Sequence, residues 1–130
     1  MNTDSKHPTS PHLQIYRLPL TALLSITHRI TGVFLTLGAL LLILVLAALA
    51  AGPASYAPVQ VLLQSWFGQL ILFILTFALY FHFCNGIRHL FWDAGLGFEL
   101  ATTDRTAHLA IIVSAILTLA TWGVASGVAW

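Results

Sequence analysis

The sequence contains an uninterrupted apolar run, LGALLLILVL, at residues 37–46. This run belongs to a much longer uncharged stretch, because no Asp, Glu, Lys or Arg occurs between Arg29 and Arg88. No such residue follows Arg105 either. Lipid or other apolar helices must solvate stretches of this length, and the run lacks the alternating polarity of a membrane β-barrel strand. The pattern therefore predicts an all-α membrane protein.

The composition excludes an ordinary soluble domain and sets the number of membrane spans. Hydrophobic residues make up 58% of the 130 residues and charged residues only 7%, whereas a soluble domain carries roughly 25% charged residues. An apolar helix needs about 20 residues to cross the hydrocarbon core. Three segments are long enough, and the predicted helices cover about residues 21–51, 62–91 and 107–130.

The remaining segments are predicted to be an arm and two connections within a single membrane-anchor domain that covers residues 1–130. Residues 1–20 are polar and contain prolines, which favours an irregular arm at the membrane surface. Residues 52–58 contain Gly and Pro and are predicted to form the first connection. Gly95 and Gly97 interrupt the second connection, after which Thr103 or Asp104 is expected to cap the third helix.

The basic residues predict the orientation of the chain. The loop at residues 52–58 has no Lys or Arg, and all five basic residues of the chain lie on the other side: Lys6, Arg17, Arg29, Arg88 and Arg105. By the positive-inside rule, the N-terminus and the second connection face the cytoplasm or the mitochondrial matrix. The polar arm lacks the Arg-rich character of a transit peptide, which favours the inner membrane of a bacterium. The net charge of +1 gives no indication of a nucleic-acid partner.

Two clusters of polar residues lie at the predicted inner ends of the first and second helices. Ionisable residues in a span are energetically costly, and each is therefore a candidate functional residue. The first cluster is SITHR at residues 25–29, in which Ser25 and Arg29 share a helix face. The second is HFCNGIRH at residues 82–89, followed by Asp93. Its two histidines, His82 and His89, share a face and are separated by roughly 10 Å along the helix axis.

The deeper histidine, His82, is a candidate axial ligand of haem iron, because an inward-facing neutral imidazole in a helical bundle suits that role. Haem propionates are anionic and prefer shallower donors, and four residues are candidates for their vicinity: His28, Arg29, Arg88 and His89. No second deep histidine fills the other axial position. A purely structural interpretation also remains open, in which His82 packs, Ser25 is a packing hydroxyl, and the arginines set topology and extend to the lipid headgroups.

Three motifs in this order resemble the cytochrome b556 subunits of succinate dehydrogenase, the large membrane anchors of respiratory complex II. They are SPHLQIYR at residues 10–17, SITHRITG at residues 25–32 and HFCNGIRHLFWD at residues 82–93. The resemblance covers essentially the whole chain. It implies a complex in which a flavoprotein oxidises succinate, an iron–sulfur protein carries the electrons, and two membrane anchors share one haem b.

The resemblance also implies roles for individual residues. His82 matches the axial haem ligand, and the second ligand is expected to be a histidine of the smaller anchor. Ser25 and Arg29 match residues that line the ubiquinone pocket, with Arg29 and His28 also near the propionates. Arg88, His89 and Asp93 match the last motif, where supporting roles are expected.

The expected function is thus that of a non-flavin subunit of succinate dehydrogenase, acting in the tricarboxylic acid cycle and the respiratory chain. Succinate oxidation itself is expected on another chain. Two alternatives remain: a fumarate reductase anchor that works in the reverse direction, and a non-redox anchor or assembly protein in which His82 only packs.

Overall fold

A computed structural model describes residues 17–127, and all of its regular elements are helices. They are α1 (Leu20–Ala50), α2 (Pro53–Gln64), α3 (Trp66–Asp93) and α4 (Leu100–Gly127). Three of them, α1, α3 and α4, are long and apolar enough to cross a membrane. The predicted all-α membrane fold with three spans is confirmed.

The boundaries differ from the predicted ones at three places. The first connection is not a loop, because residues 53–64 form the short helix α2. The helix α3 starts at Trp66 instead of residue 62. The helix α4 starts at Leu100, so Thr103 and Asp104 lie inside it. Thr103 is therefore not a cap, and its hydroxyl donates to the carbonyl oxygens of Gly97 and Glu99. Residues 128–130, the predicted end of the last helix, lie outside the described part.

The glycines and prolines of the first connection shape α2 instead of preventing it. Gly52 adopts a φ of 102°, which favours glycine, and Pro53 follows in the first turn of α2. Pro58 lies inside the helix. A proline there removes one backbone donor, and the short helix accommodates this loss on an exposed face.

A sharp bend separates α2 from α3 at Ser65, whose backbone is extended. The Ser65 hydroxyl caps α3 by accepting a hydrogen bond from the Gly68 amide at 3.1 Å. A Cβ at position 68 would lie 2.2 Å from the carbonyl oxygen of Leu62. The bend therefore requires glycine at position 68 because α2 approaches α3 too closely for a side chain.

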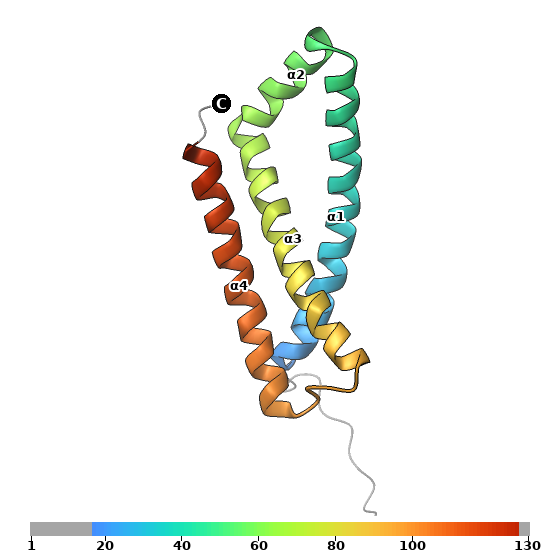
Figure 1. Cartoon of the computed structure of the whole chain (residues 1–130), viewed down its shortest axis with the longest axis vertical. Helices are drawn as coiled ribbons and strands as arrows, with labels where there is room; N and C mark the ends of the chain where they lie inside the picture. The colour runs from blue at the N-terminus through green and yellow to red at the C-terminus, as the bar shows by residue number, and fades with distance from the viewer. Residues whose placement is uncertain (1–16, 128–130) are drawn as a thin grey trace, which may run out of the picture.

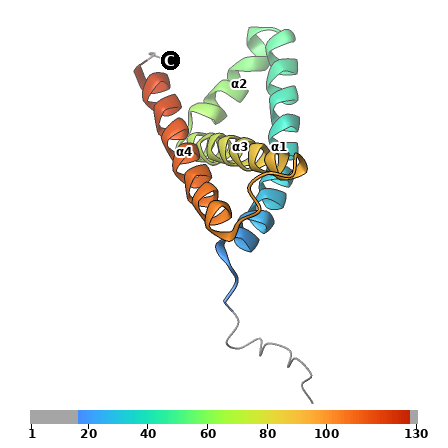
Figure 2. The ribbon, with the colours of Figure 1, turned by 60° about the horizontal axis from the view of Figure 1, so that its bottom comes forward.

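The helices converge at one end of the molecule and diverge at the other (Figure 1). We call these the inner end and the outer end. The inner end contains the start of α1, the end of α3 and the start of α4. Seen from a second direction, α1 and α4 lie on different sides of α3, and α2 links the outer ends of α1 and α3 (Figure 2).

The core lies toward the inner end. Leu24, Phe81 and Ala107, one from each spanning helix, form its centre, with Leu20, Phe77 and Ile111 packed against them. On α4, small residues recur on the face that is buried: Ala107, Ala110, Ser114 and Thr118. Small residues let membrane helices approach closely, which explains why α4 packs along α3.

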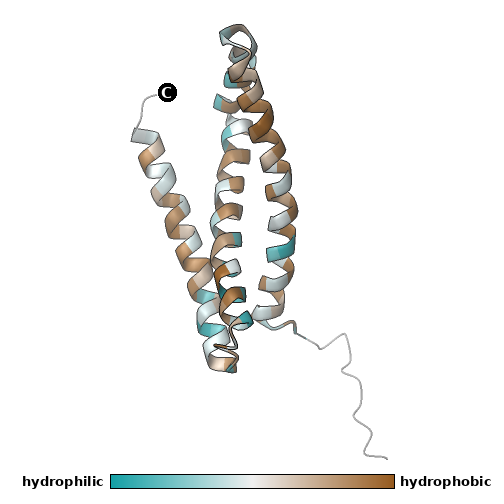
Figure 3. Ribbon diagram, turned by 45° about the vertical axis from the view of Figure 1, so that its right-hand side comes forward, coloured by the Kyte–Doolittle hydropathy of each residue, from teal (hydrophilic) through white to brown (hydrophobic). Residues whose placement is uncertain are grey.

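The described arginines all belong to the inner end. Arg17 precedes α1, Arg29 lies in its first turns, Arg88 is near the end of α3 and Arg105 is near the start of α4. The hydrophilic ribbon segments at this end of α3 and α4 agree with this placement (Figure 3). Lys6, the remaining basic residue, lies outside the described residues. The one-sided charge is thus also a feature of the fold.

Candidate functional site

The site is built where α1 crosses α3 at the inner end, and it contains three histidines. His28 belongs to α1, and His82 and His89 belong to α3. The imidazole rings of His28 and His82 are stacked, with centroids 3.9 Å apart and planes 11° from parallel. The ring of His89 also contacts that of His28, with centroids 5.1 Å apart and planes tilted by 46°. His28 therefore connects the two histidines of α3, and we call the three rings, in the contact order His82, His28 and His89, the histidine row.

Glycines on both helices lie next to the histidine rings at this crossing. A Cβ at Gly32 on α1 would lie 3.2 Å from Cε1 of His82, and one at Gly86 on α3 would lie 4.0 Å from Cε1 of His28. Each histidine thus packs near a glycine of the opposite helix. The two motifs identified in the sequence meet here, and the tight contact is the one at Gly32, since a Cβ 4.0 Å away at Gly86 would be an ordinary contact.

The ring of His82 is held through Nδ1. This nitrogen lies 3.1 Å from the carbonyl oxygen of His28 and 3.2 Å from Oγ1 of Thr31. A carbonyl oxygen only accepts hydrogen bonds, so the proton of a neutral His82 is on Nδ1. The lone pair is then on Nε2, the nitrogen that remains able to coordinate a metal. The residues present therefore fit the requirement of an axial ligand to haem iron.

His28 is half-buried, and its Nδ1 is buried without a hydrogen-bond partner among residues 17–127. Buried polar atoms usually have a partner. This atom therefore identifies the row of histidines as a place where a group from outside the chain is expected to bind.

Ser25 and Arg29 lie on α1 beside His28, as predicted. Ser25 is half-buried and Arg29 is exposed. Within the described part of the chain, neither side chain forms a hydrogen bond. Their donors are therefore free to bind a ligand or another subunit at the inner end.

Arg88 is placed differently from the other predicted site residues. It is 7% exposed, between α3 and α4. Nη1 donates to Oδ1 of Asn85 at 2.5 Å, Nε donates to Oγ1 of Thr106, and Nη2 donates to the carbonyl oxygen of Thr103. The predicted position of Arg88 near haem propionates stays a prediction, while these bonds show that its side chain is directed at α4.

The last predicted residues of the motif continue the row on α3. The ring of His89 contacts the ring of Trp92 edge to face, with centroids 5.0 Å apart. The guanidinium carbon of Arg88 lies 4.8 Å from the centre of the Trp92 ring. Trp92 thus joins the histidine row to the buried arginine, while Asp93 is exposed at the end of α3. The arm motif at residues 10–16 lies outside the described residues.

Three residues of the site had no role in the predictions: Thr31, Gly32 and Asn85. Asn85 is 1% exposed, and its Nδ2 donates to the carbonyl oxygen of Leu24 on α1. Together with the bonds of Arg88, this contact connects all three spans. The available signal was that Asn85 is a polar residue inside a span, which is costly unless it is paired.

Fold and site together define a class of protein: a membrane-spanning helical bundle with a histidine site at one membrane edge. The chain belongs to the family described as succinate dehydrogenase/fumarate reductase transmembrane subunit, whose model matches residues 3–121.

Individual relatives agree with this family. The chain is 43% identical to the succinate dehydrogenase cytochrome b556 subunit of Paracoccus denitrificans, over 86% of this chain and 88% of that protein. It is 37% identical to the subunit of the same name from Rickettsia felis, over 91% and 92%. It is also 36% identical to the cytochrome b560 subunit of Reclinomonas americana, over 94% and 88%. The family recognised from the three motifs is confirmed.

Proposed function

We propose that this chain is a membrane-anchor subunit of succinate:quinone oxidoreductase that binds haem b jointly with a second anchor and helps form the ubiquinone-reduction site. The observation that carries the haem assignment is the hydrogen bond from Nδ1 of His82 to the carbonyl oxygen of His28. It keeps Nε2 available to the iron. The names of the cytochrome b556 relatives support the presence of a haem b.

The proposed partners follow from what the chain itself provides. It supplies one candidate axial histidine, so the second ligand is assigned to the partner anchor. Succinate oxidation and the iron–sulfur centres are assigned to two peripheral subunits, the flavoprotein and the iron–sulfur protein. A bound haem would accept and return one electron at a time. His28, whose ring contacts that of His82, and His89, whose ring contacts that of His28, are proposed to lie near the propionates together with Arg29.

For the quinone, we propose that Ser25 and Arg29 provide the donors. Reduction adds two electrons and two protons to the quinone, whose oxygens become more basic as the electrons arrive. The hydroxyl of Ser25 can donate to a quinone oxygen, and the cation of Arg29 stabilises the developing negative charge. Arg29 is exposed toward the inner end, and the proposal assigns the supply of protons to water on that side of the membrane. The electrons come from succinate, which loses two electrons and two protons to become fumarate on the flavoprotein.

The proposed location is the cytoplasmic membrane of a bacterium, with the inner end facing the cytoplasm. The described arginines at that end support this orientation.

A His82→Leu variant tests the haem assignment. In the purified complex, the reduced-minus-oxidised spectrum is expected to lose or shift its b-type absorbance, because leucine offers no donor to iron. An unchanged spectrum would exclude His82 as the ligand. A wild-type complex that assembles without haem would support the non-redox alternative.

Ser25→Ala and Arg29→Ala test the quinone site. Each is expected to lower succinate-to-quinone electron transfer about 10-fold or more, since a donor to the developing charge is worth about 1.5–3 kcal/mol. Succinate oxidation with an artificial dye should be preserved, because the dye accepts electrons upstream. Equal loss of both activities would indicate failed assembly instead.

The family description also includes fumarate reductase. Comparison of the two reaction directions in the same preparation distinguishes that alternative: faster fumarate reduction with a quinol than succinate oxidation with a quinone would favour it.

A further inference from the structure

Thr31 is one of only two buried residues of α1, at 8% exposed. Its hydroxyl donates to the carbonyl oxygen of His28 at 2.8 Å. A hydroxyl has one proton and two lone pairs, so Oγ1 can accept a hydrogen bond while it donates this one. The atom placed to donate to it is Nδ1 of His82, at 3.2 Å.

These contacts form a closed set of three polar groups. The proton on Nδ1 of His82 is shared between the carbonyl oxygen of His28 and Oγ1 of Thr31. The hydroxyl of Thr31 is in turn oriented by that same carbonyl. Each group therefore fixes the position of the other two, and the imidazole has two acceptors on one edge.

Gly32 lies against the ring of His82 on its Cε1 side, next to Nδ1. An added Cβ would lie 3.2 Å from Cε1 and 3.8 Å from Nδ1 of His82. The backbone of Gly32 is helical, so its conformation does not call for glycine, whereas a Cβ there would require the ring of His82 to shift by a few tenths of an ångström. The surface of α1 at Thr31 and Gly32 thus fits against the edge of the His82 ring.

We infer that Thr31 and Gly32 are positioning residues for His82, which fix its tautomer and its ring orientation for iron coordination. This inference rests on the proposed function, in which His82 ligates haem. Partners on the second nitrogen of a ligating histidine orient the ring and make it a stronger donor, and their loss commonly lowers metal affinity 10–100-fold. A stronger donor stabilises ferric over ferrous haem. The hydroxyl of Thr31 is therefore expected to lower the midpoint potential of the haem.

The test uses the purified, membrane-extracted complex with Thr31→Val, which removes the hydroxyl and keeps the branched shape. The haem midpoint potential is expected to shift to more positive values. The rate at which haem is lost to an excess of a haem-binding acceptor protein is expected to rise about 10-fold. Thr31→Ser retains the hydroxyl and should restore both properties.

The matched control is Thr36→Val on the same helix. Thr36 is exposed, and among residues 17–127 its hydroxyl bonds only to the carbonyl oxygen of Gly32. This variant should keep the wild-type potential and haem retention. If Thr31→Val and Thr36→Val give the same potential and the same haem retention, the positioning role of Thr31 is excluded.

Gly32→Ala tests the second half of the inference, with Gly123→Ala as its control because a Cβ at position 123 meets nothing within 4 Å. We expect a shifted haem spectrum only for Gly32→Ala, since its methyl group displaces the ring of His82. Identical spectra for both variants would exclude the role of Gly32.

Two further variants distinguish a failure of the positioning inference from a failure of the haem-ligand assignment. If His82→Leu loses its haem while Thr31→Val behaves like Thr36→Val, only the positioning inference fails. If His82→Leu keeps an unchanged spectrum, the ligand assignment itself fails. Thr31→Ala removes the hydroxyl with less bulk at the helix crossing, and it provides the same two readouts if the valine variant gives no complex.

Discussion

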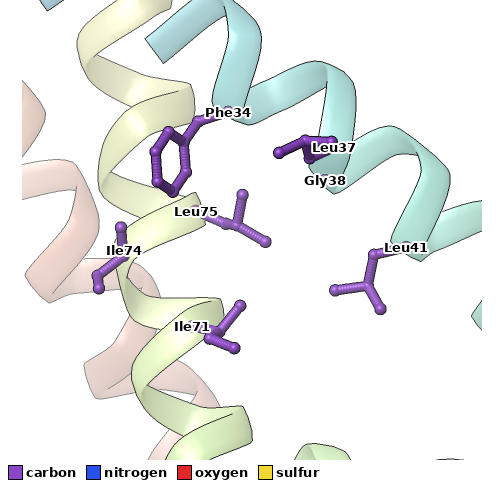
Figure 4. A pocket seen from close by; sticks show the side chains of 7 residues that line it. All are labelled: Phe34, Leu37, Gly38, Leu41, Ile71, Ile74 and Leu75. Atoms are coloured by element: carbon purple, nitrogen blue, oxygen red, sulfur yellow. The ribbon is translucent and has the colours of Figure 1, made fainter. Parts of the chain in front are cut away.

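The inner and outer ends of the molecule are packed in different ways, although the same helices build both. At the inner end, Leu24, Phe81 and Ala107 form a small core, and Asn85 and Arg88 add a buried hydrogen-bond network. Toward the outer end, α1 separates from α3 and buries no residue beyond Thr31. An apolar groove of about 230 Å³ opens between the two helices (Figure 4).

The difference shows what holds membrane helices together. Leucines of α1 such as Leu40 and Leu44 are more than half exposed, but lipid solvates them as well as protein would. Without a hydrophobic drive between helices, association depends on close packing and hydrogen bonds. Between α1 and the other spans, both are concentrated at the inner end, where the candidate site lies. The end at which α1 and α3 pack closely is thus also the end that carries the candidate site.

The largest expected effect comes from breaking the buried network with Asn85→Leu. This change removes the acceptor for Arg88 and the donor to Leu24, and leaves the guanidinium with an unsatisfied donor. We expect a loss of about 3 kcal/mol in the free energy of unfolding, measured by titrating the detergent-solubilised protein with SDS.

Gln60→Leu is the outer-end control for this experiment. Gln60 is exposed on α2, and its substitution should change the same free energy by less than about 0.5 kcal/mol. Similar losses in the two variants would contradict the difference between the ends.

A smaller effect is expected for Leu24→Ala, which leaves a cavity in the core at the inner end. Lipid solvates a leucine side chain about as well as the protein core does, so little is lost by exposing it to lipid. The lost van der Waals contacts should lower the free energy of unfolding in SDS by about 2 kcal/mol. Leu40→Ala is the matched change on the outer half of α1, and it should leave the free energy of unfolding of the isolated subunit almost unchanged. If Leu40→Ala becomes as costly as Leu24→Ala in the assembled complex, a partner subunit covers that surface.

The smallest effect concerns one of the few polar contacts at the outer end. Nε1 of Trp122 donates to Oγ1 of Thr76 at 3.3 Å, between α4 and α3. Trp122→Phe should lower the free energy of unfolding by about 0.6 kcal/mol, as for average hydrogen bonds between membrane helices. Trp66→Phe is the control, because Trp66 is 79% exposed. A loss above about 2 kcal/mol for Trp122→Phe would mean that the outer end is more firmly held than its packing indicates.

Hydropathy predicted the spans well because solvation by lipid depends on the local run of residues. The start of α1 was predicted within one residue, whereas α4 begins seven residues before its predicted start. Asp104 and Arg105 are charged and suggested a connection, but a helix can extend beyond the membrane into water. Local composition therefore identifies the apolar part of a helix and not its full length.

The clusters at the inner end were also visible in the sequence, since ionisable residues are rare in spans. The sequence did not show which residues of these clusters contact one another or another helix. Arg88 and His89 are neighbours in the chain, but successive residues of a helix point about 100° apart. As a result, Arg88 contacts α4 while His89 approaches α1.

The sequence by itself determined the helical class, the three spans, the end that carries the arginines and the family. These properties follow from composition along the chain and from motifs. Only the tertiary structure decided that His28 stacks on His82, that Nδ1 of His82 lies within hydrogen-bond distance of both Thr31 and the carbonyl of His28, and that Arg88 is buried. The physical reason is that these contacts depend on where α1 crosses α3, and close packing across several helices sets that position.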